Sequence, residues 1–282
     1  MKLVVAAAIL LSNAAQAAPM KVMITSFESY GGRAANGSDL VAKQLAALSK
    51  NGEIEFVNCT LPVEFEVAGK KAIECYEAHN PKPDVVVSLG EDPQHSCSIT
   101  LENEAQNLMI DMFGEAKGKK KFFEKIEAEG PTVEEFSLPV PDMFCSSASE
   151  ISEKLRPSAS LGHFVCNDVA YRMARYLKPK SVPYGFIHVP APELCKKAPP
   201  PAETAAKVRR MVLAGAHSLS VSRPEMAALP VPCENEGVAR ELAQLAQNAS
   251  DGCKAFVAAE IIRRQDQDDA LTAPQIRPKR NR

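Results

Sequence analysis

Short apolar runs alternate along this chain with stretches in which apolar residues recur at helical spacing. The run at 84–89 is apolar almost throughout and closes on Gly90, which is the pattern of a strand covered on both faces. Similar runs predict strands at 21–27, 53–63 and 184–189. This alternation predicts a three-layer α/β/α fold with a mostly parallel, twisted sheet, of the phosphorylase/hydrolase-like kind.

The predicted helices follow these strands. Ser38 is placed to cap the first helix, which we expect to end at Leu48. A basic stretch at 117–125 and an acidic one at 127–135 are expected to lie on a solvated excursion rather than to form a binding surface. Further helices are predicted at 64–78, 143–155, 167–177, 205–219 and 236–246.

The two ends of the chain differ from the part between them. A basic start, an apolar run at 3–11 and an Ala-x-Ala sequence ending at Ala17 predict a secretory signal peptide at 1–17, and therefore an exported protein, periplasmic or secreted. The alternative is a disordered or core-buried N-terminus. No apolar run is long enough to cross a bilayer, so no membrane attachment is predicted after cleavage. The main domain is predicted at 18–219, followed by a C-terminal extension at 220–282 whose last residues are expected to be disordered.

Composition narrows the classes of function. With 45% hydrophobic and 24% charged residues the chain has the makeup of a soluble globular protein. A formal net charge of -2 gives no electrostatic reason to expect a nucleic-acid partner. The sequence contains no phosphate-binding loop, dinucleotide fingerprint or Cys/His cluster, so no cofactor and no metal site are predicted.

Eight cysteines can pair if the chain is exported. None forms a Cys-x-x-Cys, which argues against a zinc ribbon or a thioredoxin motif. Cys233 and Cys253 are an attractive pair because both lie in the extension. Cys166 has two interpretations, a reduced nucleophile or one half of a structural disulfide.

The surroundings of Cys166 favour the first interpretation. It stands at the predicted start of a helix, where free N–H groups and the helix dipole stabilise a thiolate and can receive an oxyanion. His188 ends a predicted strand, at the sheet edge where open α/β folds keep their sites. A thiol and an imidazole are two parts of a cysteine hydrolase, and a third group must orient the imidazole. Spacing alone prefers neither Glu102 nor Asp168 for that role, and His188 taken alone would be interpreted as a core histidine.

Several segments, in order over about residues 20 to 217, resemble the pyroglutamyl peptidase I family, which are cysteine peptidases of α/β/α fold. The residues at 162–167 (Gly-His-Phe-Val-Cys-Asn) and 186–190 (Phe-Ile-His-Val-Pro) are similar to its nucleophile and histidine motifs. The other similar segments are 27–32 (Phe-Glu-Ser-Tyr-Gly-Gly; family Phe-Glu-Pro-Phe-Gly-Gly), 36–38 (Asn-Gly-Ser; Asn-Pro-Ser), 61–63 (Leu-Pro-Val), and 100–102 with 105–107 (Thr-Leu-Glu and Ala-Gln-Asn; Thr-Pro-Glu and Ala-x-Asn).

The resemblance implies an enzyme that removes an N-terminal 5-oxoproline from a peptide through a Glu, Cys, His triad. Carried over residue by residue, Glu102 orients the imidazole, Cys166 attacks the acyl carbonyl, and His188 acts first as base and then as acid. The partner implied is a peptide with a blocked N-terminus, and the resemblance also suggests self-association into a homo-oligomer.

The same resemblance assigns residues to the substrate pocket. Phe27 and Tyr30 would stack against the lactam ring, with Asn36 and Asn107 as further substrate-binding residues. A neutral cyclic amide suits aromatic walls and a few backbone hydrogen bonds. The alternative for Phe27 and Tyr30 is ordinary core packing.

The chain departs from the family in three places. Residues 90–97 (Gly-Glu-Asp-Pro-Gln-His-Ser-Cys) replace a Gly-rich run that ends in Arg, so Gln94 or His95 would have to donate to the oxyanion. Loss of one such donor costs on the order of a hundredfold or more in rate. Residues 158–162 also differ, and the export signal and long tail are unusual beside compact cytosolic members. These departures leave two alternatives: altered acyl or amide specificity, or a catalytically weakened periplasmic binding protein.

Overall fold

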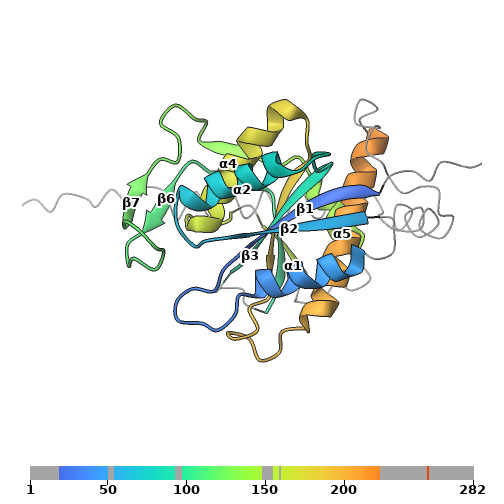
Figure 1. Cartoon of the computed structure of the whole chain (residues 1–282), viewed down its shortest axis with the longest axis horizontal. Coiled ribbons are helices and arrows are strands. Elements are labelled where there is room, and N and C mark those ends of the chain that lie inside the picture. Colours follow the sequence, from blue (N-terminus) through green and yellow to red (C-terminus); the bar gives the residue numbers. More distant parts are fainter. Residues whose placement is uncertain are drawn as a thin grey trace, which may run out of the picture.

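The structure is a computed structural model that describes residues 19–49, 54–92, 97–147, 155–158, 160–222 and 253. These residues build a six-stranded sheet between helices, together with two small two-stranded sheets (Figure 1). The predicted α/β/α fold is therefore confirmed. Within the described residues, no helix is long and apolar enough to cross a membrane. The predicted signal peptide at 1–17, the helix at 236–246, Gln94 and His95 lie outside the described residues.

The sheet has the strand order β2-β1-β3-β10-β4-β9. Neighbouring strands from β2 to β10 run parallel, β4 pairs antiparallel with β10, and β9 runs parallel to β4. The carboxyl ends of β1, β3 and β10 consequently meet at one edge, which we call the catalytic edge. The strands are β1 (Met20–Phe27), β2 (Ile54–Leu61), β3 (Val85–Glu91), β4 (Ile99–Glu102), β9 (Leu155–Ser158) and β10 (Tyr184–Val189).

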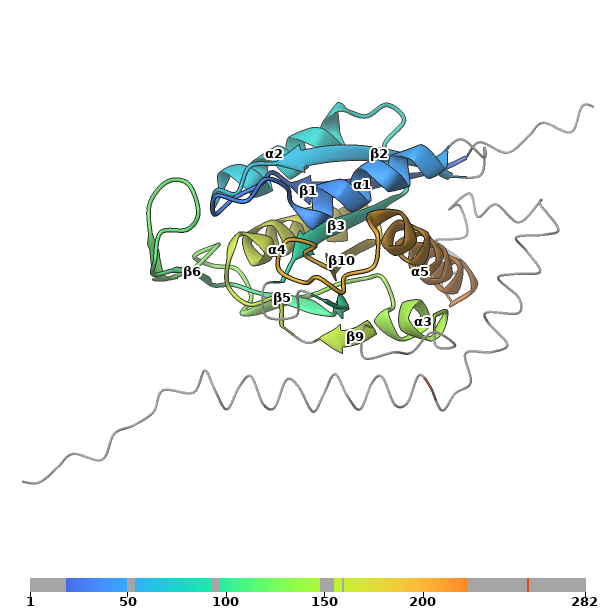
Figure 2. The same ribbon diagram turned by 90° about the horizontal axis from the view of Figure 1, so that it is seen from below.

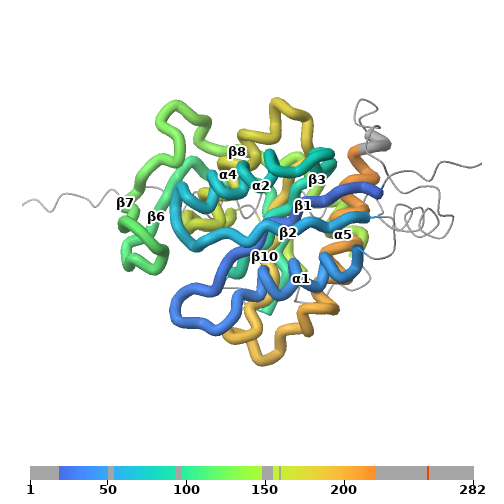
Figure 3. The backbone as a smooth tube through the Cα atoms, in the orientation of Figure 1, coloured from blue at the N-terminus to red at the C-terminus, as the bar shows by residue number. Residues whose placement is uncertain are grey.

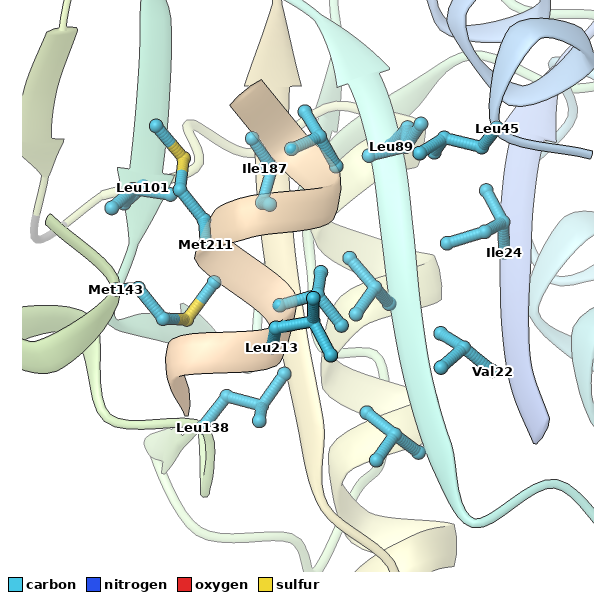
Figure 4. Packing of buried hydrophobic residues seen from close by; sticks show 14 of the residues in the cluster. Val22, Ile24, Leu45, Leu89, Leu101, Leu138, Met143, Ile187, Met211 and Leu213 are labelled. Carbon is cyan, nitrogen blue, oxygen red and sulfur yellow. The ribbon is translucent and has the colours of Figure 1, made fainter. Parts of the chain in front are cut away.

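Helices cover both faces of this sheet (Figure 2). On one face lie α1 (Gly37–Leu48), α3 (Val140–Cys145) and α5 (Pro201–Ser222), and on the other α2 (Val67–Ala78) and α4 (Val165–Leu177). Both faces of a central strand are therefore apolar: Val85 and Val87 point to the first cluster, and Val86 points to the second. Figure 4 shows the first cluster, in which Met211 and Leu213 of α5 pack over the strands.

The N-terminus of α1 is capped by Asn36, not by Ser38 as predicted. The Asn36 side chain accepts a hydrogen bond from the Ser38 amide at 3.0 Å. The Ser38 hydroxyl instead accepts from the Phe27 amide at 3.0 Å, which joins the end of β1 to the start of α1. Both residue types cap helices well, so composition alone could not separate two candidates only two positions apart.

The middle of the chain corrects one prediction and bears out another. The helix predicted at 143–155 is wrong, because α3 ends at Cys145 and Leu155 already begins strand β9. The charged stretches at 117–125 and 127–135 are mostly exposed, as predicted, and they contribute one strand to each of the two small sheets. These sheets are β5 (Glu104–Gln106) with β8 (Val133–Glu135), and β6 (Met109–Asp111) with β7 (Lys121–Glu124).

Three disulfides cross-link the described residues: Cys59 with Cys75, Cys97 with Cys195, and Cys145 with Cys253. The predicted pairing of Cys233 with Cys253 is therefore wrong. Cys253 packs against the same apolar cluster as α3, which brings it to Cys145 rather than to a neighbour in sequence. Cys166 is a free thiol, so its interpretation as half of a disulfide is also wrong.

Candidate active site

Cys166 lies in the first turn of α4, where the helix dipole is positive. The amides of Asn167 and Asp168 donate to the carbonyl oxygen of Phe164, at 2.9 and 3.3 Å. Within the described part of the chain this leaves the amides of Val165 and Cys166 without an acceptor. The half-buried thiol therefore stands beside N–H groups that can receive a negative oxygen.

His188 is buried near the carboxyl end of β10, and Glu102 lies on the adjacent strand β4. In this antiparallel pair Glu102 is opposite Phe186, two residues from His188, so the side chains of Glu102 and His188 share one face of the sheet. The His188 Nδ1 atom is 2.7 Å from Glu102 Oε1. The sheet register thus fixes the orientation of the imidazole.

Gly90, near the end of β3, allows the thiol and the imidazole to converge. A Cβ atom at this position would lie 2.9 Å from Cys166 Sγ, which is closer than Cβ contacts are in proteins, and 3.1 Å from His188 Cδ2, which is closer than most of them. The Cys166 thiol and the His188 ring therefore both lie against Gly90. Cys166, His188 and Glu102, which come from α4, β10 and β4, are thus brought together at the catalytic edge.

Competing effects set the protonation of His188. Burial lowers the pKa of the imidazole, but its hydrogen bonds to Cys166 and Glu102 and their negative charges outweigh burial and raise the pKa of His188 from 6.5 to about 10. The ring is consequently an imidazolium at neutral pH. An imidazolium beside a sulfur nucleophile is the proton donor that acyl transfer to sulfur requires.

Asp168, the other candidate for the third group, is bound elsewhere. Its Oδ1 accepts from Arg172 at 2.8 Å and its Oδ2 accepts from the Glu66 amide at 2.7 Å. Burial raises the pKa of Asp168, and the Arg172 guanidinium acts against this shift. The structure brings Glu102, not Asp168, to His188.

Aromatic side chains line the approach to the thiol. The ring of Tyr30 lies 6.1 Å from the ring of Phe164, and Phe65 meets Phe164 edge-on at 5.6 Å. Burial, followed by the negative charge of Cys166, raises the pKa of Tyr30 to about 12, so its hydroxyl stays a neutral donor. Phe27, the last residue of β1, is buried in the apolar cluster that β1 shares with α2 and α4.

The two asparagines that the sequence assigned to the pocket have structural partners. Asn36, as described above, caps α1, and its Nδ2 donates to the Glu28 carbonyl oxygen at 3.1 Å. Asn107 Nδ2 donates to the carbonyl oxygens of Glu127 and Gly130, and its Oδ1 accepts from the Glu127 amide. Their hydrogen bonds shape the loops around the site, and a direct contact of either residue with substrate stays a prediction.

Sequence reasoning missed four residues of the site. Phe164 and Phe186 supply aromatic faces, and Phe186 lies 5.0 Å from the His188 ring. Arg33 forms an ion pair with the buried Glu91, and its guanidinium lies 4.3 Å from the centre of the Tyr30 ring. Phe164 and Phe186 stand inside motifs that the sequence offered, whereas no local pattern links residues 33 and 91.

Comparison with known proteins gives one consistent result. The family model described as pyroglutamyl peptidase matches residues 20–216. The pyrrolidone-carboxylate peptidase of Vibrio parahaemolyticus is 33% identical over 170 residues, which are 60% of this chain and 78% of that protein. The protein of the same name from Pyrococcus furiosus is 32% identical over 176 residues, covering 61% and 81% of the two chains.

Solved structures that resemble this chain carry the same family names. Pyroglutamyl peptidase I from Bacillus amyloliquefaciens superposes with a TM-score of 0.63 at 25% identity, covering 70% of this chain and 95% of that one. Pyrrolidone carboxyl peptidase from Thermococcus litoralis gives a TM-score of 0.64 at 25% identity, covering 72% and 96%.

Proposed function

This chain belongs to the pyroglutamyl peptidase family, and we propose on that basis that it is a cysteine peptidase that removes an N-terminal pyroglutamate from peptides. The observation that carries the proposal is the convergence of the Cys166 thiol and the His188 ring on Gly90, with 2.7 Å between His188 Nδ1 and Glu102 Oε1. A nucleophile, a proton carrier and an orienting carboxylate are the parts that acyl transfer to sulfur needs.

The first half of the proposed reaction forms an acyl-enzyme. The Cys166 thiolate attacks the carbonyl carbon that joins the lactam ring to the next residue, and the carbonyl oxygen becomes negative beside the amides of Val165 and Cys166. The carbon–nitrogen bond then breaks as the His188 imidazolium gives its proton to the leaving amine. The products are a thioester on Cys166 and the shortened peptide.

The second half restores the enzyme. Neutral His188 takes a proton from water, whose oxygen attacks the thioester carbon. The carbon–sulfur bond breaks, 5-oxoproline leaves, and Cys166 is again a thiolate beside an imidazolium. Glu102 keeps the imidazole in one orientation through both halves, since its Oε1 holds Nδ1.

The surroundings of the thiol suit the proposed acyl group. The lactam ring is small, flat and uncharged, and Tyr30 and Phe164 offer aromatic surface next to Cys166. Arg33 and Glu91, which lie at this wall, neutralise each other as an ion pair.

Hydrolysis of pyroglutamyl-aminomethylcoumarin tests this function. We expect steady turnover by the protein, no turnover by Cys166→Ala, and a thermal unfolding midpoint of Cys166→Ala close to that of the parent. Loss of function without loss of fold would assign the chemistry to the thiol. Turnover by Cys166→Ala, or an inert thiol toward iodoacetamide, would contradict the proposal and favour a binding protein that kept the fold.

We also propose that the protein works in an oxidising compartment, as its predicted signal peptide suggests. Three disulfides among the described residues support this, because such bonds persist outside the reducing cytosol. Fractionation of cells that express the full chain checks it: processed protein is expected in the exported fraction, and unprocessed protein in the cytosol would contradict it.

A further inference from the structure

The hairpin of β6 and β7 exposes an apolar surface that the proposed chemistry does not use. Of the seven large hydrophobic side chains that are exposed in the described residues, four are here: Met112 (47% exposed), Phe113 (79%), Phe122 (60%) and Phe123 (68%). In the backbone trace the hairpin stands out at one end of the molecule (Figure 3). We call these four residues, together with Lys119 and Lys120, the hairpin patch.

The charge around the patch is positive. Residues 112–125 contain five lysines and two glutamates. Lys117 pairs with Glu28 at 3.3 Å, and Lys121 pairs with Glu66 and Glu124. Lys119 and Lys120 are exposed and have no acidic partner in the described part of the chain. The patch therefore combines an aromatic surface with two lysine side chains that form no ion pair among the described residues.

The backbone is distorted so that two consecutive phenylalanines both face solvent. Met109 pairs with Glu124 and Asp111 with Lys121, so β7 carries one residue more than β6 between these pairs. At this bulge Phe123 has a φ of 55°, a left-handed conformation that is strained for any residue other than glycine. A strained bulge that exposes aromatic rings beside a catalytic edge points to a binding function.

Hydrogen bonds place the hairpin next to the nucleophile. The Ile110 amide donates to the carbonyl oxygen of His163, three residues before Cys166, and the Lys117 amide donates to the Val63 carbonyl oxygen, each at 2.9 Å. The Glu115 charge acts on Tyr30. In both ribbon views the hairpin and the loop between β1 and α1 lie at the same end of the molecule (Figures 1 and 2).

We propose that the hairpin patch binds the part of the substrate that follows the pyroglutamate, and that it selects peptides with aromatic and acidic side chains there. This inference rests on the proposed function. A ring held between Tyr30 and Phe164 leaves the rest of the peptide to extend toward solvent, at about 3.3 Å per residue. Phenylalanine rings would stack on aromatic side chains, and Lys119 and Lys120 would attract carboxylates.

Matched substrates test the selection. We compare kcat/KM for pyroglutamyl-Ala-Phe-Asp-Asp-amide, pyroglutamyl-Ala-Ser-Lys-Lys-amide and pyroglutamyl-aminomethylcoumarin, which has no downstream residues. The acidic-aromatic peptide is expected to exceed the basic peptide about 10-fold at low salt, and added salt should reduce that ratio. Equal values for the two peptides would overturn the proposal.

Charge variants locate the effect. In the double variant Lys119→Glu/Lys120→Glu, the ratio of kcat/KM for the acidic-aromatic peptide to kcat/KM for the basic peptide should come close to one. Hydrolysis of the coumarin substrate should be unchanged. The control is Lys196→Glu/Lys197→Glu, which makes the same change at two exposed lysines in the segment that follows β10. If both double variants change this ratio equally, the effect comes from electrostatic attraction between the peptide and the overall charge of the protein, and the hairpin patch does not bind the peptide.

A variant that relieves strain separates binding from folding. Phe123→Gly suits the observed backbone angle, so its thermal midpoint should equal or exceed that of the parent. Its kcat/KM for the acidic-aromatic peptide should fall about 5-fold, while the coumarin substrate is unaffected. An unchanged kcat/KM for this peptide would overturn the proposal. So would patch variants that alter only self-association, which would indicate that a second copy of the chain binds the patch, or only binding to anionic vesicles, which would indicate a lipid surface.

Binding to Cys166→Ala keeps the two proposals distinguishable. If no substrate is hydrolysed, the proposed function fails, but fluorescence anisotropy of the labelled acidic-aromatic peptide still measures the patch. Binding that weakens in the Lys119→Glu/Lys120→Glu background supports the hairpin patch on its own. Binding that is absent, or indifferent to that change, contradicts it.

Discussion

At the scale of single residues, Glu102 shows how strongly the site depends on charge. The carboxylate is buried, its Oε1 is bonded to His188, and its Oε2 has no hydrogen-bond partner among the described residues. An unpaired buried carboxylate oxygen is costly in free energy. We therefore expect the Glu102 charge to serve a purpose that outweighs this cost, which is to raise the pKa of the neighbouring His188 imidazole.

Replacing Glu102 by Gln removes this charge and keeps the shape of the side chain. The pKa of His188 should then fall from about 10 toward or below its ordinary value, because burial is no longer opposed by the carboxylate. In the parent, activity should decline only as pH rises through about 10, where the imidazolium loses its proton. The variant should decline at lower pH and lose on the order of a hundredfold in kcat at neutral pH.

Stability should follow the same titration. A pKa raised by folding contributes stability that is complete below the unfolded value of 6.5 and disappears as pH rises through about 10. The gap in thermal midpoint between parent and Glu102→Gln is therefore expected to be largest below pH 6.5 and to close toward pH 10. Glu135→Gln, on the exposed side of β8, is the control. If the thermal midpoint depends on pH in the same way in the parent, in Glu102→Gln and in Glu135→Gln, a role for Glu102 at His188 is refuted.

At the scale of elements, the sequence predicted the strands and helices that carry strong apolar patterns. The run that became β3 and the helix that became α4 were both placed within a few residues. Strands of three or four residues, such as β5 and β9, are too short to show a period and were missed. Spacing alone could not choose the partner of His188, because that choice depends on β4 lying antiparallel beside β10, a pairing between residues 86 positions apart. Only the family resemblance pointed to Glu102.

The loop between β1 and α1 is held by Glu91, the last residue of β3. Glu91 accepts from the Gly37 amide and from Arg33, and Arg33 covers the Tyr30 ring. Glu91→Ala would leave Arg33 partly buried without its partner, so the free energy of unfolding should fall by roughly 2–4 kcal/mol. Because Tyr30 loses its support, KM for the coumarin substrate should rise more than kcat falls.

Two comparisons make this prediction specific. Arg33→Met/Glu91→Gln removes both charges and should recover much of the stability but not the low KM. Glu28→Gln breaks an exposed ion pair with Lys117 and should change stability by less than about 1 kcal/mol. A parent-like KM in the double variant would show that the pair stabilises the fold without positioning Tyr30.

At the scale of the whole molecule, the disulfides tie the catalytic edge and the C-terminal region to the sheet. Cys97 and Cys195 join the segment after β3 to the segment after β10, on either side of the site. Cys145 and Cys253 bind α3 to a residue far beyond the end of α5 at Ser222. Cys59 and Cys75 join β2 of the sheet to α2, a helix on one face of it.

Removing these bonds one at a time should separate stability from activity. Cys97→Ser/Cys195→Ser and Cys59→Ser/Cys75→Ser should each lower the free energy of unfolding by about 2–4 kcal/mol, because each bond closes a loop of the unfolded chain. Only the first pair borders the catalytic edge, so only its removal should lower kcat on the coumarin substrate at temperatures where both variants are folded. Chemical denaturation and steady-state kinetics measure the two effects independently. An equal loss of kcat in both variants would mean that the disulfides act through global stability alone. A loss confined to Cys97→Ser/Cys195→Ser would show that an oxidising compartment, in which this disulfide forms, contributes to activity as well as to folding.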